Sequence, residues 1–155
     1  MNDKSSKPIL ICGYGNPGRQ DDGLGPALVA ELEACAPAEG LSGIVFDSNY
    51  QLNVEDALAV AESRAVVFVD ASKEGQAPFE FRPLASRKET TFTSHALAPE
   101  TVLALADELY GARPPAWLLA IRGEAWAPNA APTAAALSHL AAAREFLQAW
   151  LRNER

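Results

Sequence analysis

Cysteine, histidine and long apolar runs are all scarce in this sequence. Its 155 residues include two cysteines and two histidines, and the spacing of Cys12 and Cys35 matches neither a disulfide framework nor a cysteine-based zinc module. Both cysteines lie in apolar segments, so we expect two buried, reduced thiols. No apolar run approaches the roughly 20 residues that a membrane-spanning helix needs. These absences argue against a small disulfide-stapled protein and against a transmembrane protein.

Positive charge is also in the minority. Lysine and arginine number 13 against 20 aspartates and glutamates, which gives a formal net charge of −7. An acidic surface repels phosphate groups, so we expect no nucleic-acid partner and no membrane partner. Residues 1–7 are polar and the apolar stretch after them is too short for a secretory signal, which favours a cytoplasmic protein. The length and the ordinary hydrophobic content of 48% predict one globular domain over residues 1–155.

Apolar strand-like segments alternate with amphipathic helical segments along the chain. The expected strands cover residues 8–12, 43–46, 65–69, 79–82 and 117–121, and the expected helices cover residues 24–34, 54–62, 99–110 and 133–150. This alternation predicts an α/β fold with a largely parallel sheet covered on both faces. In such sheets, ligands bind beyond the carboxyl ends of the strands. Asp47, Asp70 and the loop after Cys12 all fall at that edge, where we expect the functional site.

The loop after the first strand matches the dinucleotide-binding pattern GxGxxG at residues 13–18. Two features oppose that interpretation. Asp21 and Asp22 stand at the start of the following helix, where their charges would repel a pyrophosphate. Asp47, the candidate ribose-binding acid, lies 29 residues past Gly18, whereas about 20 is usual. A nucleotide-binding or regulatory α/β domain without hydrolytic activity therefore stays the alternative function.

The adjacent acids Asp21 and Asp22 exceed what a helix start requires. One of the two is expected to cap the helix, as acids commonly do. The glycines that follow, Gly23 and Gly25, allow the backbone to bend closely around a ligand or a partner. The second acid is then free to point into the cleft.

His95 completes a set of metal-binding side chains. It lies in a polar loop before the helix at 99–110, whereas His139 lies among alanines of the last helix and is interpreted as a surface or packing residue. With Asp22 and Asp70 it provides two carboxylates and one imidazole, and leaves positions open for water or a foreign ligand. Such a set suits nickel or zinc. Asp70 also has a simpler interpretation, as a cap of the turn after its strand.

A nucleophilic serine or cysteine is the competing mechanism. Ser48, Ser72 and Ser94 are available, but no GxSxG elbow is present. Ser94 also adjoins His95 in the sequence, which is poor geometry for a general base. Neither cysteine has the polar, electropositive surroundings that activate a thiol.

Residues 13–25 read Gly-Tyr-Gly-Asn-Pro-Gly-Arg-Gln-Asp-Asp-Gly-Leu-Gly. This run resembles GxGNxxxxDDGxG, the opening signature of the nickel–iron hydrogenase maturation endopeptidases. Three further features are similar to the same family. They are the strand that ends in Asp70 and Ala71, the loop histidine His95, and the late strand with its proline-containing loop and final helix, matched over residues 118–133. The resemblance covers almost the full length of the chain.

The resemblance implies a three-layer α/β/α sandwich around a five-stranded, mostly parallel mixed sheet with an antiparallel fourth strand. It implies an endopeptidase that cleaves a C-terminal extension from a hydrogenase large-subunit precursor after nickel has been inserted. In the family, residues at the positions of Asp22, Asp70 and His95 bind the metal, and we expect these three to be the catalytic residues. The nickel is expected to arrive with the substrate, and zinc or cadmium could take its place in a crystal. We expect the chain to be a monomer.

Further residues around the cleft are expected to bind the substrate, namely Asn16, Asp47, Ser48 and Asn49. The last three stand where the family commonly has Asp-Gly-Gly, so this difference concerns which precursor is recognised. Segments 50–52 and 97–111 resemble the branch of the family that serves soluble, NAD-coupled hydrogenases. A relative that binds a hydrogenase subunit without cutting it is a further alternative.

Overall fold

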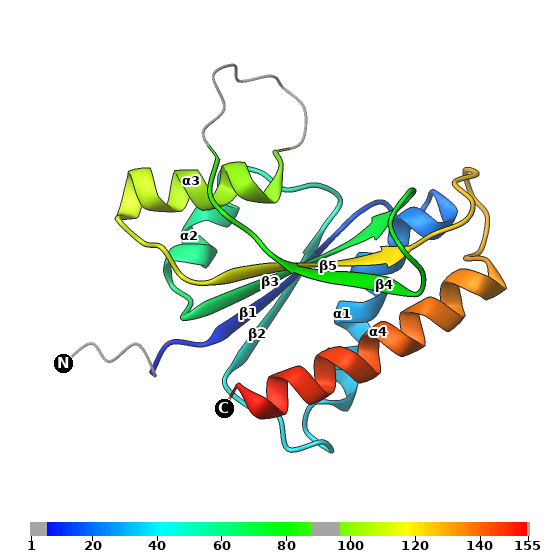
Figure 1. Cartoon of the computed structure of the whole chain (residues 1–155), viewed down its shortest axis with the longest axis horizontal. Coiled ribbons are helices and arrows are strands. Elements are labelled where there is room, and N and C mark those ends of the chain that lie inside the picture. The colour runs from blue at the N-terminus through cyan, green and yellow to red at the C-terminus, as the bar shows by residue number, and fades with distance from the viewer. Residues whose placement is uncertain (1–5, 88–96, 155) are drawn as a thin grey trace.

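Over residues 6–87 and 97–154, which the computed structural model describes, the chain forms three layers around a five-stranded sheet (Figure 1). The strands are β1 (Ile9–Tyr14), β2 (Ile44–Asn49), β3 (Ala65–Ser72), β4 (Phe79–Pro83) and β5 (Ala116–Arg122). Their order is β2-β1-β3-β5-β4. β4 runs antiparallel to β5, whereas the other neighbouring pairs are parallel. The predicted mixed sheet, with its antiparallel fourth strand, is confirmed.

Helices cover both faces of the sheet. One face carries α1 (Leu24–Cys35) and α4 (Ala134–Asn153), and the other carries α2 (Asp56–Ala61) and α3 (Pro99–Tyr110) (Figure 1). These bounds agree with the sequence predictions to within three residues at each end. Thr133 caps α4, because its Oγ1 accepts a hydrogen bond from the Ala136 N–H at 3.1 Å.

The alternation of side chains along the central strands divides the core in two. Ile11 and Val67 face α1 and α4, whereas Cys12 and Phe68 face α2 and α3. β3 is buried on both faces over residues 65–69, as its continuous apolar run predicted. Because side chains alternate with a period of two, Asp70 continues the α2–α3 face beyond Phe68.

Three strands run further than their sequences suggested, and the first of them, β1, continues past Cys12 to Tyr14. β2 continues past Asp47 to Asn49, because its pairing with β1 extends to Tyr14. β3 continues past Asp70 to Ser72, which is paired with Arg122 of β5. Asp47 and Asp70 therefore lie within paired strands, and the sheet fixes the direction of their side chains.

The two cysteines are free thiols in different surroundings. Cys12 is buried, as predicted. The expectation of a buried Cys35 is wrong, because this residue ends α1 and is half-buried, with its thiol donating to the Leu32 carbonyl at 3.5 Å. No helix in the described part of the chain is long and apolar enough to cross a membrane.

Candidate functional site

Asp21 and Asp22 lie in a short 3-10 turn, η2 (Gln20–Gly23), between the glycine loop and α1. The residue that precedes α1 at its cap position is Gly23, and no side chain caps this helix. The prediction that one of the two acids caps the helix is therefore wrong. Successive residues of a 3-10 turn point about 120° apart, so the two carboxylates face different parts of the molecule.

Asp21 is fully buried and has a structural role. Its carboxylate accepts hydrogen bonds from the backbone N–H groups of Glu124 at 2.7 Å, Ala125 at 3.0 Å and Thr133 at 2.8 Å, and from the Thr133 hydroxyl at 2.8 Å. Burial raises the pKa of Asp21, but these four hydrogen bonds outweigh it and hold the pKa below its usual value. Asp21 thus fixes η2 to the segment between β5 and α4.

Asp22 and Asp70 are brought together at the carboxyl edge of the sheet. Both are half-buried; Asp22 Oδ2 accepts from the Asn16 N–H at 2.8 Å, and Asp70 Oδ1 accepts from the Ala71 N–H at 2.8 Å. Burial and the negative charge of Asp22 raise the pKa of Asp70 to about 7, against the opposing effect of its hydrogen bonds. A half-buried carboxylate whose ionisation is opposed by burial and by a neighbouring carboxylate belongs to a donor set that a divalent cation can satisfy.

Tyr14 belongs to the same site and was not selected from the sequence. Its hydroxyl forms a hydrogen bond with the Asp70 carboxylate, which restricts the orientation of that group. Burial, followed by the charge of Asp70, raises the pKa of Tyr14, so the phenol stays neutral. The signal available in the sequence was an aromatic residue between the first two glycines of the loop.

The third predicted metal ligand, His95, falls in the segment 88–96, outside the described residues. Its place beside Asp22 and Asp70 stays a prediction. His139, interpreted from the sequence as a surface or packing residue, lies with its ring Nδ1 2.9 Å from the Arg122 carbonyl oxygen.

The four residues expected to bind substrate lie in two places. Asn16 is half-buried beside Asp22, and its Oδ1 accepts from the Gly18 N–H at 2.9 Å. Ser48 and Asn49 are exposed at the end of β2. The structure does not group Asp47 with Asp22 and Asp70: its carboxylate lies with the side chains of Cys12 and Asp56. The acids of this edge thus form two groups instead of the single one expected.

The glycine loop packs against its own chain. At Gly15, where φ is +140°, a Cβ would lie 2.1 Å from the Asp22 carbonyl oxygen, and at Gly25 it would lie 2.4 Å from the Val69 carbonyl oxygen. Loop N–H groups already have partners, namely Gly15 to the Asn49 carbonyl, Asn16 to Asp22, Gly18 to the Asn16 side chain and Arg19 to the Asn16 carbonyl. A phosphate-binding loop needs free N–H groups. This loop is instead built to bring η2 close to the sheet.

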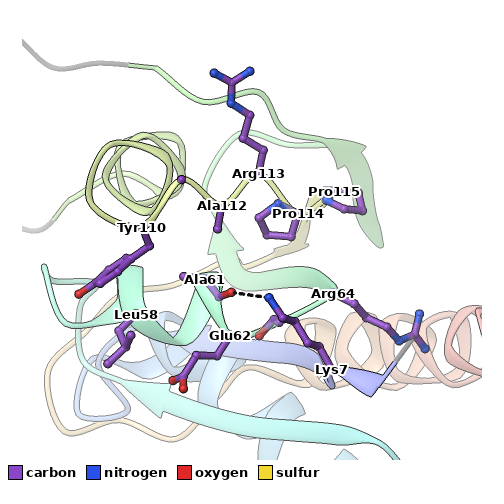
Figure 2. Close-up of a pocket in the computed structure, with 12 residues that line it drawn as sticks. Lys7, Leu58, Ala61, Glu62, Arg64, Tyr110, Ala112, Arg113, Pro114 and Pro115 are labelled. Atoms are coloured by element: carbon purple, nitrogen blue, oxygen red, sulfur yellow. Dashed lines mark hydrogen bonds between the residues drawn. The ribbon is translucent and has the colours of Figure 1, made fainter. Parts of the chain in front are cut away.

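A hollow of about 530 Å³ lies at the opposite edge of the sheet (Figure 2). Its walls include Lys7, Arg64 and Pro115, which lie one or two residues before β1, β3 and β5. The Lys7 ammonium donates to the Ala61 carbonyl at 3.4 Å (Figure 2). This hollow lies at the amino ends of the strands, where parallel sheets do not usually place their chemistry.

Comparisons with known proteins find similarity to this chain in structure. No protein-family model and no curated protein matches its sequence. A [NiFe] hydrogenase maturation protease HycI from Thermococcus kodakarensis KOD1 is 19% identical with a TM-score of 0.70, and the match covers 96% of this chain and 97% of that one. The hydrogenase maturating endopeptidase HybD from E. coli is 20% identical with a TM-score of 0.65, over 95% of this chain and 93% of that one.

A hydrogenase 2 maturation peptidase from a Thaumarchaeota archaeon gives a similar result, with 18% identity, a TM-score of 0.66 and coverage of 94% and 98%. Identities this low establish the fold and leave the activity to be argued from the site. The chain therefore has the α/β fold of solved hydrogenase maturation proteases, and it places Asp22 and Asp70 together at the carboxyl edge of its sheet.

Proposed function

We propose that this chain is an endopeptidase that removes a C-terminal extension from a nickel-loaded hydrogenase large-subunit precursor. The observation that carries the proposal is the pairing of Asp22 and Asp70 at the carboxyl edge of a sheet whose solved neighbours are hydrogenase maturation proteases. The glycine signature at 13–25 supports it from the sequence. We further propose that the protein is a monomer and acts in the cytoplasm. Its precursor would belong to the soluble, NAD-coupled hydrogenases.

The nickel in this proposal belongs to the substrate. Asp22, Asp70 and His95 would contact it, and it would supply Lewis acidity, either to the scissile carbonyl or to a water molecule. Two carboxylates fit this role, because a cation between them offsets the burial and the neighbouring charge that raise the pKa of Asp70. Contact with the ion therefore releases the proton that Asp70 holds below pH 7. Tyr14 keeps the Asp70 carboxylate oriented, and Asn16 does the same for Asp22.

Recognition of the extended precursor is assigned to side chains around the pair. Asn16 lies beside Asp22, and Ser48 and Asn49 are exposed at the end of β2, where a peptide can reach them. A tenfold preference for nickel-loaded precursor needs only about 1.4 kcal/mol of differential binding. One carboxylate–metal contact exceeds that requirement.

Cleavage of purified precursor tests the proposal. Wild type, Asp22→Glu and Asp22→Ala are incubated with nickel-loaded and nickel-free precursor, and intact mass reports the products of both chains. We expect cleavage of the loaded precursor only, retained activity in Asp22→Glu, because a longer carboxylate still reaches the ion, and loss of at least about a hundredfold in Asp22→Ala. Glu62→Ala is the matched control, because it removes an exposed carboxylate from the opposite edge.

The outcomes separate the alternatives. Equal cleavage of nickel-free precursor would reject the metal requirement, and full activity of Asp22→Ala would reject Asp22 as a ligand. Stable binding of precursor without any cleavage would favour a non-cutting relative. Thermal melts accompany the assay, because Asp22→Ala removes the hydrogen bond from the Asn16 N–H and should cost about 1 kcal/mol. A collapsed fold would instead make Asp22 a structural residue.

A further inference from the structure

Cys12, Asp47 and Asp56 form a second group of metal-ligating side chains, separate from the Asp22–Asp70 pair. They come from β1, β2 and the first residue of α2. One ligand atom of each, the Cys12 Sγ and a carboxylate oxygen of each aspartate, lies within 4.8 Å of the other two. In residues 6–87 and 97–154, no other group of at least three histidine, cysteine or acidic side chains meets this spacing.

The backbone holds this cluster in place. Cys12 and Asp47 are register partners in the parallel pair of β1 and β2, so their side chains leave the same face of the sheet side by side. Asp56 starts α2 on that face, and its Oδ2 accepts from the Asn53 N–H at 2.8 Å. Ligands that stand on strands and on a fixed helix start are preorganised, in contrast to ligands on loops.

The Cys12 thiol distinguishes this cluster from an ordinary group of surface acids. Cys12 is 1% exposed, and its thiol has no hydrogen bond to any residue that the structure describes. A buried cysteine usually serves as a small apolar residue among apolar neighbours. That role does not account for two carboxylates within 4.8 Å of the sulfur, one of which belongs to Asp56, a residue only 6% exposed.

The charges in the cluster oppose one another. Burial raises the pKa of Cys12, and the charges of Asp56 and Asp47 raise it further. Burial also raises the pKa of Asp56, against its hydrogen bond from Asn53 and with a contribution from Asp47. A divalent cation at the centre reverses each of these unfavourable interactions.

The spacing fits a small ion. When three atoms lie within 4.8 Å of one another, the centre of the triangle is at most about 2.8 Å from each, and zinc requires about 2.3 Å to sulfur and 2.0–2.2 Å to oxygen. Side-chain rotations that move each atom by less than about 1 Å therefore suffice. A thiolate ligand favours zinc-like ions over calcium or magnesium.

We propose that Cys12, Asp47 and Asp56 bind one zinc-like divalent ion that joins β2 to the start of α2. On binding, the Cys12 thiol releases its proton to solvent, and the thiolate and the two carboxylates coordinate the ion. Asp47 is half-buried, so water can occupy the remaining position. The proposal requires neither a precursor nor the proteolytic activity, and each can fail without the other.

Cobalt is the probe that tests this site. The full-length, metal-free protein is titrated with Co²⁺ at neutral pH, and absorbance reports the thiolate-to-cobalt charge-transfer band in the near ultraviolet. We expect one equivalent of Co²⁺ to produce this band, and an equal amount of Zn²⁺ to remove it. The Asp22–Asp70 pair lacks a sulfur ligand, so an ion bound there gives no such band.

Three variants test whether the Cys12 thiolate is the source of this band. We expect it to disappear in Cys12→Ser and to persist in Cys35→Ser, which removes the other thiol, and in Asp22→Ala, which alters the other site. Absence of the band in wild type, or its persistence in Cys12→Ser, would overturn the proposal. If Cys12→Ser does not fold, Asp47→Asn decides: this isosteric change should weaken Co²⁺ binding at least about tenfold, and unchanged affinity would exclude Asp47 and the proposed site.

Discussion

Replacing Asp70 by asparagine tests whether burial and the charge of Asp22 make an ionised Asp70 unfavourable in the folded protein. The pKa of Asp70 is about 7, whereas an aspartate in an unfolded chain titrates near about 3.9. Below about pH 4 Asp70 is protonated in both states, and the folded protein has its full stability. As the pH rises from about 4 through 7, the unfolded chain releases this proton more readily than the folded protein. The free energy of unfolding therefore decreases over this range.

The magnitude follows from the pKa and from the surroundings of Asp70. A shift of about three pKa units corresponds to at most about 4 kcal/mol. Asp70 is half-buried, and water screens part of the interaction, so we expect about 1–2 kcal/mol. Asparagine fits the site, because its carbonyl can accept from the Ala71 N–H and its amide can donate to the Tyr14 hydroxyl.

Urea denaturation and thermal melts at pH 4, 6 and 8, with a chelator present, measure the effect. At pH 8 we expect Asp70→Asn to unfold with a free energy higher than that of wild type by about 1–2 kcal/mol and to melt about 3–6 °C higher. At pH 4 the two proteins should be alike. Glu62→Gln, at an exposed acid of the opposite edge, should follow wild type throughout. Lower stability of Asp70→Asn at pH 8, or an equal gain at pH 4 and pH 8, would refute the raised pKa of Asp70.

Three further results are expected. Asp21→Ala should lower the free energy of unfolding in urea by about 3–5 kcal/mol, because it leaves three part-buried N–H groups without their acceptor; a change below about 1 kcal/mol would contradict this. Gly25→Ala should lower the melting temperature by about 6 °C or more, because its Cβ meets the Val69 carbonyl oxygen at 2.4 Å; an unchanged melting temperature would show that the contact relaxes freely. Calorimetry with NAD, NADP, ATP and FAD should show no saturable binding at sub-millimolar concentration, and a clear isotherm would favour the nucleotide-binding alternative.

The alternation of strands and helices was sufficient to predict the sheet and its covering helices. The continuous apolar run at residues 65–69 identified β3 as a central strand, because only a strand buried on both faces lacks polar residues. The antiparallel direction of β4 came from the family resemblance. Strand ends were less accurate, because polar residues such as Asp47 and Asn49 remain paired when the neighbouring strand continues beside them.

The roles of the adjacent acids could not be separated from the sequence. Asp21 and Asp22 have the same side chain, and their difference depends on contacts with Asn16 on one side and Thr133 on the other. Thr133 lies 112 residues from Asp21, and no local pattern signals that distance. The Cys12 cluster was missed for a similar reason, because its three members become neighbours only through the register of β1 with β2 and the placement of α2.

The two acids of η2 have different roles, and this contrast bears on the proposed function. Asp21 stabilises the fold through four hydrogen bonds, and so holds η2 firmly at the edge of the sheet. The held turn keeps Asp22 near Asp70, although burial and then repulsion by the charge of Asp22 raise the pKa of Asp70. A nickel-loaded precursor would relieve that repulsion, whereas a nickel-free precursor would leave it in place. Relief of about 1.4 kcal/mol favours the loaded precursor tenfold. If the proposed function holds, the unfavourable charge pair in the free site therefore contributes directly to the selectivity of the enzyme for loaded precursor.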